Sequence, residues 1–114
     1  MENQSEVSDK QRSYEISKQV RKELGDIPES IRDQFLVALE NISWGLESGL
    51  TVAYLKAVGK GVAELKINGR PAYRLVYTTK FPSKLVVLAA RSKTCEGQDK
   101  KLIEVAASRL KDYK

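Results

Sequence analysis

The stretch GVAELKINGRPAYRLVYT, residues 61–78, decides the fold that we expect. From Ala63 to Ile67 apolar and polar residues alternate, which is the period-two pattern of a half-buried strand. Asn68-Gly69 is a hairpin turn signal, and the stretch 72–78, rich in Tyr and Val, predicts the returning strand. The centre of the chain therefore predicts an antiparallel β-hairpin.

The segments on either side of this hairpin complete the predicted fold. Residues 84–90 (KLVVLAA) form a continuous apolar run, typical of a third, central strand, and a basic loop over 91–101 is expected to follow it. Apolar residues spaced four apart predict a helix over 14–24 and a second helix that begins near Pro28. A last helix is expected over about 99–113. We expect an α+β fold in which an N-terminal helical hairpin and a C-terminal helix pack on one face of a small antiparallel sheet, whose other face can be open and polar.

Length and composition limit the classes of protein that need to be considered. A chain of 114 residues is long enough for one hydrophobic core and too short for two. Residues 1–12 are polar and predict a disordered segment, followed by one domain over 13–114. No stretch approaches the roughly 18 apolar residues of a membrane span. The single cysteine, Cys95, and the lack of histidine leave no zinc site and no internal disulfide. No acidic cluster indicates a magnesium site, so we expect a cytoplasmic protein without metal or cofactor.

The net charge of +5 is unevenly distributed along the sequence. Acidic residues are in excess before Gly49, and the basic excess lies entirely in the part that follows. Nucleic acid is the commonest polyanion that binds such a surface. A solubilising charge without a partner explains the composition equally well, so charge alone leaves both interpretations open.

Several short motifs follow one another along the chain in a fixed order. They are Ile27-Pro28-Glu29-Ser30-Ile31-Arg32, Leu55 with Gly59 and Gly61, Glu64-Leu65, Tyr73-Arg74-Leu75-Val76-Tyr77, Leu88-Ala89-Ala90, Lys93-Thr94 and Arg109-Leu110-Lys111. This order is similar to that of the RelE/HigB toxin superfamily, and most of all to its phage-derived HigB-like branch, over residues 14–113. Where that branch has His-Ala-Phe-x-Lys-Lys, this chain has Ala89-Ala90-Arg91-Ser92-Lys93-Thr94. The family often opens with a short edge strand, which we do not find before Tyr14.

The resemblance implies the toxin of a type II toxin–antitoxin system. Such a toxin is an endoribonuclease that cuts mRNA on the ribosome without a metal ion and so inhibits translation. Its implied partners are mRNA, the ribosome and a cognate HigA-like helix-turn-helix antitoxin. Cleavage by attack of a 2′-OH on the adjacent phosphate needs a base, an acid and groups that stabilise the phosphorane charge.

Four residues are the predicted catalytic groups: Arg74, Lys66, Lys93 and Glu64. Arginine matches the dianionic transition state because its planar fork donates two hydrogen bonds to phosphate oxygens. An ion pair of Arg74 with Glu64 would explain both residues structurally, and Lys66 and Lys93 read equally well as solvated lysines. Tyr73 and Tyr77, on the opposite face of the strand from Arg74, are expected in the core. The predicted RNA-binding residues are Arg91, Lys56, Lys60, Lys80, Lys84, Lys100 and Lys101.

Two other functions fit the same sequence. ParE-type toxins share this fold and inhibit DNA gyrase by binding, without catalysis, and fold alone does not decide between the two. A degenerate member of the family that only binds an antitoxin is the third interpretation.

Overall fold

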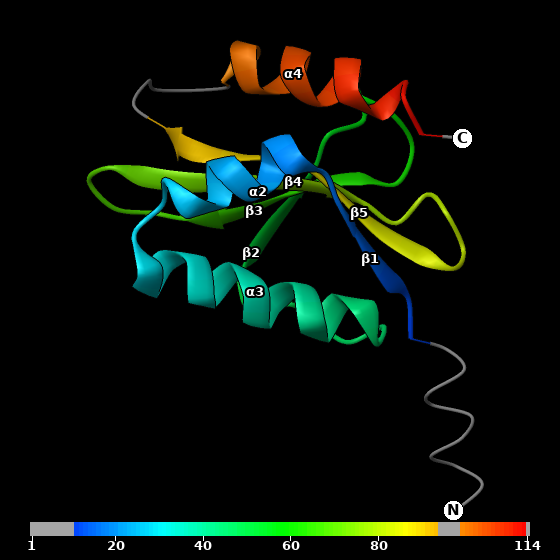
Figure 1. Ribbon diagram of the computed structural model, residues 1–114, viewed down its shortest axis with the longest axis horizontal. Coiled ribbons are helices and arrows are strands. Elements are labelled where there is room, and N and C mark those ends of the chain that lie inside the picture. Colours follow the sequence, from blue (N-terminus) through cyan, green and yellow to red (C-terminus); the bar gives the residue numbers. More distant parts are fainter. Residues whose placement is uncertain (1–10, 94–98, 114) are drawn as a thin grey trace, which may run out of the picture.

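The computed structural model describes residues 11–93 and 99–113, in which five strands and three helices follow one another along the chain (Figure 1). Thr94 and Cys95 lie outside the described residues, as does most of the segment expected to be disordered. The elements are β1 (Ser13–Ile16), α2 (Lys18–Gly25), α3 (Glu29–Ser43), β2 (Thr51–Tyr54), β3 (Val62–Ile67), β4 (Ala72–Thr78), β5 (Lys84–Lys93) and α4 (Lys100–Leu110).

The strands form one mixed sheet in the order β1-β5-β4-β3-β2. The meander β2-β3-β4-β5 is antiparallel throughout, and β1 adds to it in parallel beside β5. The three predicted strands of the meander are confirmed. Figure 1 shows α3 on one side of this sheet and α4 on the other.

The predicted N-terminal helical hairpin is wrong, because a strand comes first. Residues 13–16 pair with 84–87 as β1, which is the short opening strand that the sequence pattern had not revealed. The four-residue spacing of Ile16 with the next apolar residues had suggested a helix from Tyr14. The side chain of Ser17 accepts a hydrogen bond from the Val20 amide, 3.2 Å, so it caps the helix and fixes its start at Lys18.

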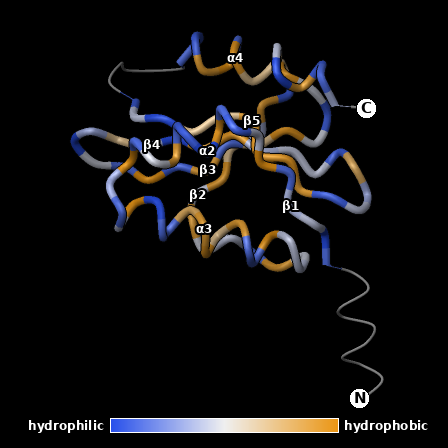
Figure 2. Tube along the Cα trace, viewed as in Figure 1, coloured by the Kyte–Doolittle hydropathy of each residue, from blue (hydrophilic) through white to orange (hydrophobic). Residues whose placement is uncertain are grey.

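The expectation that all helices pack on one face is also wrong. One core lies between the sheet and α2 with α3, and includes Val20, Phe35 and Leu39. A second core lies on the opposite face, where Leu102 and Ala106 of α4 cover the sheet. Figure 2 shows the corresponding apolar residues running through the strands in the middle layer. The sheet is therefore covered on both faces, as the continuous apolar run 84–90 requires.

A β-bulge in the β4–β5 pair decides which residues of β5 lie on which face. Tyr77 pairs with Val87, whereas the preceding residue Val76 pairs with Ala89, so β5 holds one extra residue at this point. After the bulge Arg91 pairs with Arg74, and cross-strand partners share a face of the sheet. Strict alternation from Val87 would have placed Arg91 on the face of α2 and α3.

Candidate functional site

Three cationic residues lie side by side across the sheet, on the face that α4 covers elsewhere. Lys66 of β3 pairs with Arg74 of β4, which in turn pairs with Arg91 of β5. Neighbouring strands are about 4.8 Å apart, so these side chains form a continuous row. Lys93 follows on the same face, two residues beyond Arg91. The sequence predicted a loop from Arg91 onward, but Arg91 and Lys93 both belong to β5, and this places Arg91 opposite Arg74.

Arg74 forms the floor of this row. Its side chain is only 6% exposed, and its guanidinium donates to the Tyr73 carbonyl, 2.9 Å, and to Asn68 Oδ1, 3.3 Å. Among the residues that the structure describes, Arg74 has no carboxylate within ion-pair distance, so the predicted structural alternative, a pair with Glu64, is not formed. A buried cation normally has an anionic partner, and this one is fixed in place with donors left for one.

Glu64 is the acidic residue of the site. It lies two residues before Lys66 on the same face of β3, half-buried and paired with Val76. Burial raises the pKa of the Glu64 carboxyl above its ordinary value. The charges of Arg74, Lys66 and Lys93 act in the opposite direction, and Asp99 adds to the increase. The predicted catalytic residues are thus neighbours: the charges of Lys66, Arg74 and Lys93 all act on the Glu64 carboxyl.

The start of α4 borders this group. Asp99 caps the helix by accepting from the Leu102 amide, 3.1 Å, and its charge acts on Glu64. Lys100 and Lys101 are exposed in the first turn. The structure therefore brings these two predicted RNA-binding lysines to the end of the sheet that carries the cationic row.

Four other predicted RNA-binding residues do not join the row. They lie at the opposite end of the sheet, around the start of β3 and β5 and the end of β4. Lys84 approaches Glu15 at 3.9 Å and lies 5.2 Å from the centre of the Phe81 ring, so it already has local partners. The four residues are Lys56, Lys60, Lys80 and Lys84.

The sequence missed two residues that shape the site. Asn68 was read only as a turn residue, yet its side chain anchors Arg74. Asp99 was read as part of a helix, and its proximity to Glu64 depends on how α4 packs. In contrast, the expectation for the tyrosines is confirmed: Tyr77 is buried and Tyr73 packs on the core of the other face.

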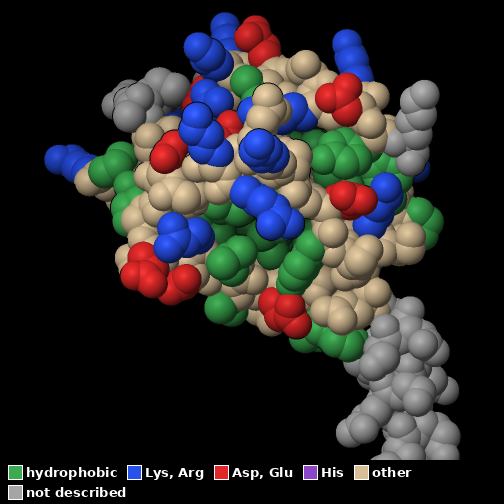
Figure 3. Space-filling model, in the orientation of Figure 1, with side chains coloured by type: hydrophobic (Ala, Val, Ile, Leu, Met, Phe, Trp, Pro, Cys, Tyr) green, Lys and Arg blue, Asp and Glu red, His purple; other side chains and the backbone are tan. Residues whose placement is uncertain are grey.

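A second group of cations, on α2, is separated from the row by the sheet. In Figure 3 lysine and arginine side chains dominate the middle of the visible face, over α2, whereas acidic and hydrophobic side chains lie around α3. Lys18, Arg21 and Lys22 are the exposed basic residues of α2. No helix in the described part of the chain is long and apolar enough to cross a membrane.

An ion pair closes the half of the β5 edge that β1 leaves open. Arg109 of α4 donates to both carboxylate oxygens of Glu23 of α2, at 3.0 and 2.8 Å, and to the Leu88 carbonyl, 2.9 Å. Glu23 also accepts from the Ala90 amide, 3.2 Å. The pair joins helices on opposite faces and holds the backbone immediately before Arg91. We call it the Glu23–Arg109 clamp.

The molecule is thus a small α+β domain with a cationic row on one face of its sheet. The family model described as phage-derived protein Gp49-like (DUF891) matches residues 22–111. Because this match spans most of the chain, the protein belongs to the Gp49-like family, which is in general a RelE/ParE-like toxin family. The resemblance is confirmed at that level, and the HigB-like branch stays a prediction. No curated protein matches the chain.

Proposed function

We propose that this protein is the toxin of a type II toxin–antitoxin pair and that it cleaves mRNA on the ribosome without a metal ion. The observation that carries the proposal is the buried Arg74, flanked in register by Lys66 and Arg91. Three aligned cations carry more positive charge than a single carboxylate would neutralise, and the phosphates of RNA are anions that could lie along such a row.

In the proposed reaction the 2′-oxygen attacks the adjacent phosphorus while the bond from phosphorus to the 5′-oxygen breaks. The Glu64 carboxylate takes the proton of the 2′-OH. Its raised pKa suits this role, because a base is more effective when its pKa lies closer to the working pH. Arg74 and Arg91 stabilise the charge on the phosphorane oxygens, and Lys66 or Lys93 gives a proton to the leaving 5′-oxygen.

The remaining roles follow from position. Lys100 and Lys101, at the start of α4, would hold the RNA backbone as it leaves the row. The partner that keeps the toxin inactive would be a HigA-like helix-turn-helix antitoxin, and the site of action would be the cytoplasm.

The test is primer extension on a reporter mRNA in a purified translation system. The wild type should produce cuts only with translating ribosomes. Because removal of one transition-state donor costs on the order of 100- to 1,000-fold in rate, Arg74→Ala should abolish the cuts. Lys66 is half-exposed, so Lys66→Ala should keep the fold. This variant should reduce cleavage even if Arg74→Ala unfolds. Lys18→Ala, which removes an equal charge from α2, should cut like the wild type.

An intact message at concentrations that stop translation would refute nuclease activity. If cells instead filament and accumulate damaged DNA while translation continues, the ParE-like alternative, binding of DNA gyrase, takes its place. A fully active Arg74→Ala variant that melts like the wild type would refute the role of Arg74.

A further inference from the structure

Arg74, the buried cation of the row, is held by neutral acceptors. Its Nη1 donates to the Tyr73 carbonyl, 2.9 Å, and its Nη2 donates to Asn68 Oδ1, 3.3 Å. Because Arg74 is only 6% exposed, water and salt screen its charge weakly. Neither a carbonyl nor an amide carries a net charge, so the two hydrogen bonds fix the guanidinium without cancelling its charge.

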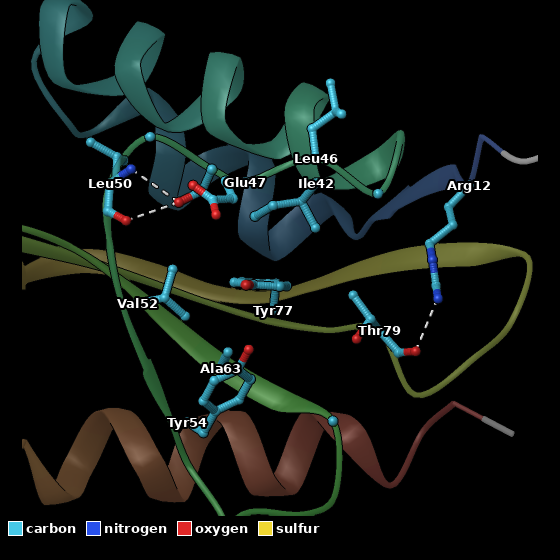
Figure 4. Close-up of a pocket in the computed structure, with 14 residues that line it drawn as sticks. Arg12, Ile42, Leu46, Glu47, Leu50, Val52, Tyr54, Ala63, Tyr77 and Thr79 are labelled. Atoms are coloured by element: carbon cyan, nitrogen blue, oxygen red, sulfur yellow. Dashed lines mark hydrogen bonds between the residues drawn. The ribbon is translucent and has the colours of Figure 1, made fainter. Parts of the chain in front are cut away.

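The other arginines whose hydrogen bonds the structure describes are bonded differently. Arg109 pairs with the Glu23 carboxylate at 2.8 Å. The others donate only to backbone carbonyls. Arg12, for example, bonds the Thr79 carbonyl at the rim of a pocket of about 700 Å³, which lies on the α3 side of the sheet and so away from the row (Figure 4). Of the described arginines, Arg74 is thus the one held by a side-chain amide.

The turn between β3 and β4 would accept aspartate in place of Asn68. Asn-Gly and Asp-Gly are both favoured hairpin sequences, because the two side chains have the same shape and suit the same backbone. Aspartate here would bring a carboxylate to Arg74 Nη2 and relieve the cost of a buried cation without an anionic partner. The neutral amide of Asn68 leaves the charge of Arg74 free for a ligand instead.

The charges around Arg74 favour an anionic ligand. Lys66 and Arg91 pair with Arg74 in register from the two neighbouring strands, so three cations lie side by side. Glu64, half-buried on the same face, is the nearby carboxylate of the described chain. One carboxylate cannot neutralise three cations, so the row keeps a positive potential that attracts an anion.

We propose that Asn68 is a positioning residue that holds Arg74 toward an RNA phosphate through a neutral hydrogen bond and so keeps the full charge of the guanidinium for that phosphate. This inference rests on the proposed function, because it takes RNA as the ligand. A carboxylate at position 68 would hold Arg74 equally well but compete with the phosphate. Loss of the side chain would leave the charge of Arg74 but not its position, so the two contributions can be separated by substitution.

The first measurement is the salt dependence of single-stranded RNA binding, by fluorescence anisotropy without ribosomes. Each phosphate that a cation neutralises contributes about 0.7 to the log–log slope. Asn68→Asp should lower the slope by about 0.7, although this variant should melt no lower than the wild type. Asn68→Ala should keep the wild-type slope, because Arg74 stays charged. Gln34→Glu, an equal change of charge on the exposed surface of α3, should also keep it.

The second measurement is the rate of mRNA cutting, by primer extension at saturating concentrations of programmed ribosomes. Displacement of a catalytic group by about 1 Å can cost on the order of 100-fold in rate. Asn68→Ala should therefore cut about 10- to 100-fold more slowly at saturation while it binds RNA with the wild-type slope. If Asn68 only shaped the turn, Asn68→Asp would bind and cut like the wild type, because Asp-Gly forms the same turn.

Four results would overturn the proposal: a wild-type slope in Asn68→Asp, a slope that Gln34→Glu lowers equally, a wild-type cutting rate in Asn68→Ala, and an Asn68→Asp variant that melts below the wild type. Failure of the proposed function gives a different pattern. A wild type that binds RNA but never cuts it would refute the nuclease, while the slopes of the two Asn68 variants would still support or overturn the role of the neutral amide. A wild type that does not bind RNA would overturn both.

Discussion

Removal of either partner of the Glu23–Arg109 clamp should destabilise the fold more than removal of any exposed ion pair in the described chain. The two side chains are each 20% exposed and share two hydrogen bonds, while each also bonds the backbone of β5. Exposed pairs contribute about 0–1 kcal/mol and fully buried ones lose about 3–5 kcal/mol when one partner is removed. The clamp lies between these limits, so we expect Glu23→Ala or Arg109→Ala to cost about 2 kcal/mol.

The assay is a double-mutant cycle in urea, with Glu23→Ala, Arg109→Ala and the double variant. The coupling free energy should be about 1.5 kcal/mol, and each single variant should melt roughly 8 °C lower than the wild type. Glu15 and Lys84, 3.9 Å apart and more exposed, form the matched control pair, with an expected coupling of about 0.5 kcal/mol or less. Hydrogen exchange of the Ala90 amide should accelerate in Glu23→Ala, because Glu23 is its acceptor.

A coupling free energy no larger than that of the control pair would refute this account of the clamp. So would unchanged exchange at Ala90 in a destabilised Glu23→Ala variant. Either result would mean that β5 holds its position, and with it Arg91, through apolar packing alone.

Three further predictions concern Glu64, Gly61 and Arg91. Burial raises the pKa of Glu64, so the folded state holds its proton more tightly than the unfolded state does. The free energy of unfolding should therefore fall as pH rises from the ordinary carboxyl pKa through the raised one. Urea titrations at a series of pH values should show this slope, and Glu64→Gln should flatten it. Gly61→Ala should destabilise by about 2 kcal/mol in urea, because Gly61 has φ +79° and an added Cβ would lie 3.2 Å from the Lys80 backbone, whereas Gly25→Ala, with open space around it, should not destabilise. Arg91→Ala should lower the salt dependence of single-stranded RNA binding by about 0.7 in log–log slope, and an unchanged slope would remove Arg91 from the RNA contacts, with Lys18→Ala as the control.

Strands with a strong local pattern could be predicted from the sequence, whereas the short edge strands could not. The period-two stretch from Ala63 to Ile67 and the run 84–90 predicted their strands correctly, because each carries enough apolar residues to define a face. β1 and β2 have only four residues each, and β1 gains its hydrogen bonds from β5, which is distant in sequence. Their own residues therefore carry little signal.

The candidate site follows the same division. The sequence by itself determined that Lys66 and Glu64 share a face of one strand, that Arg74 lies on the next, and that Tyr77 is buried on the other side. These follow from the two-residue period of a strand.

Only the tertiary structure decided that Arg91 and Lys93 join them. The bulge opposite Val76 and Tyr77 inserts one residue into β5 and reverses the faces of everything after it. No local preference of the apolar run 84–90 marks where the extra residue falls, because residues that are buried on both faces do not alternate. The packing of α4 over one end of that face, which leaves the cationic row beyond its start, was decided in the same way by contacts between distant segments.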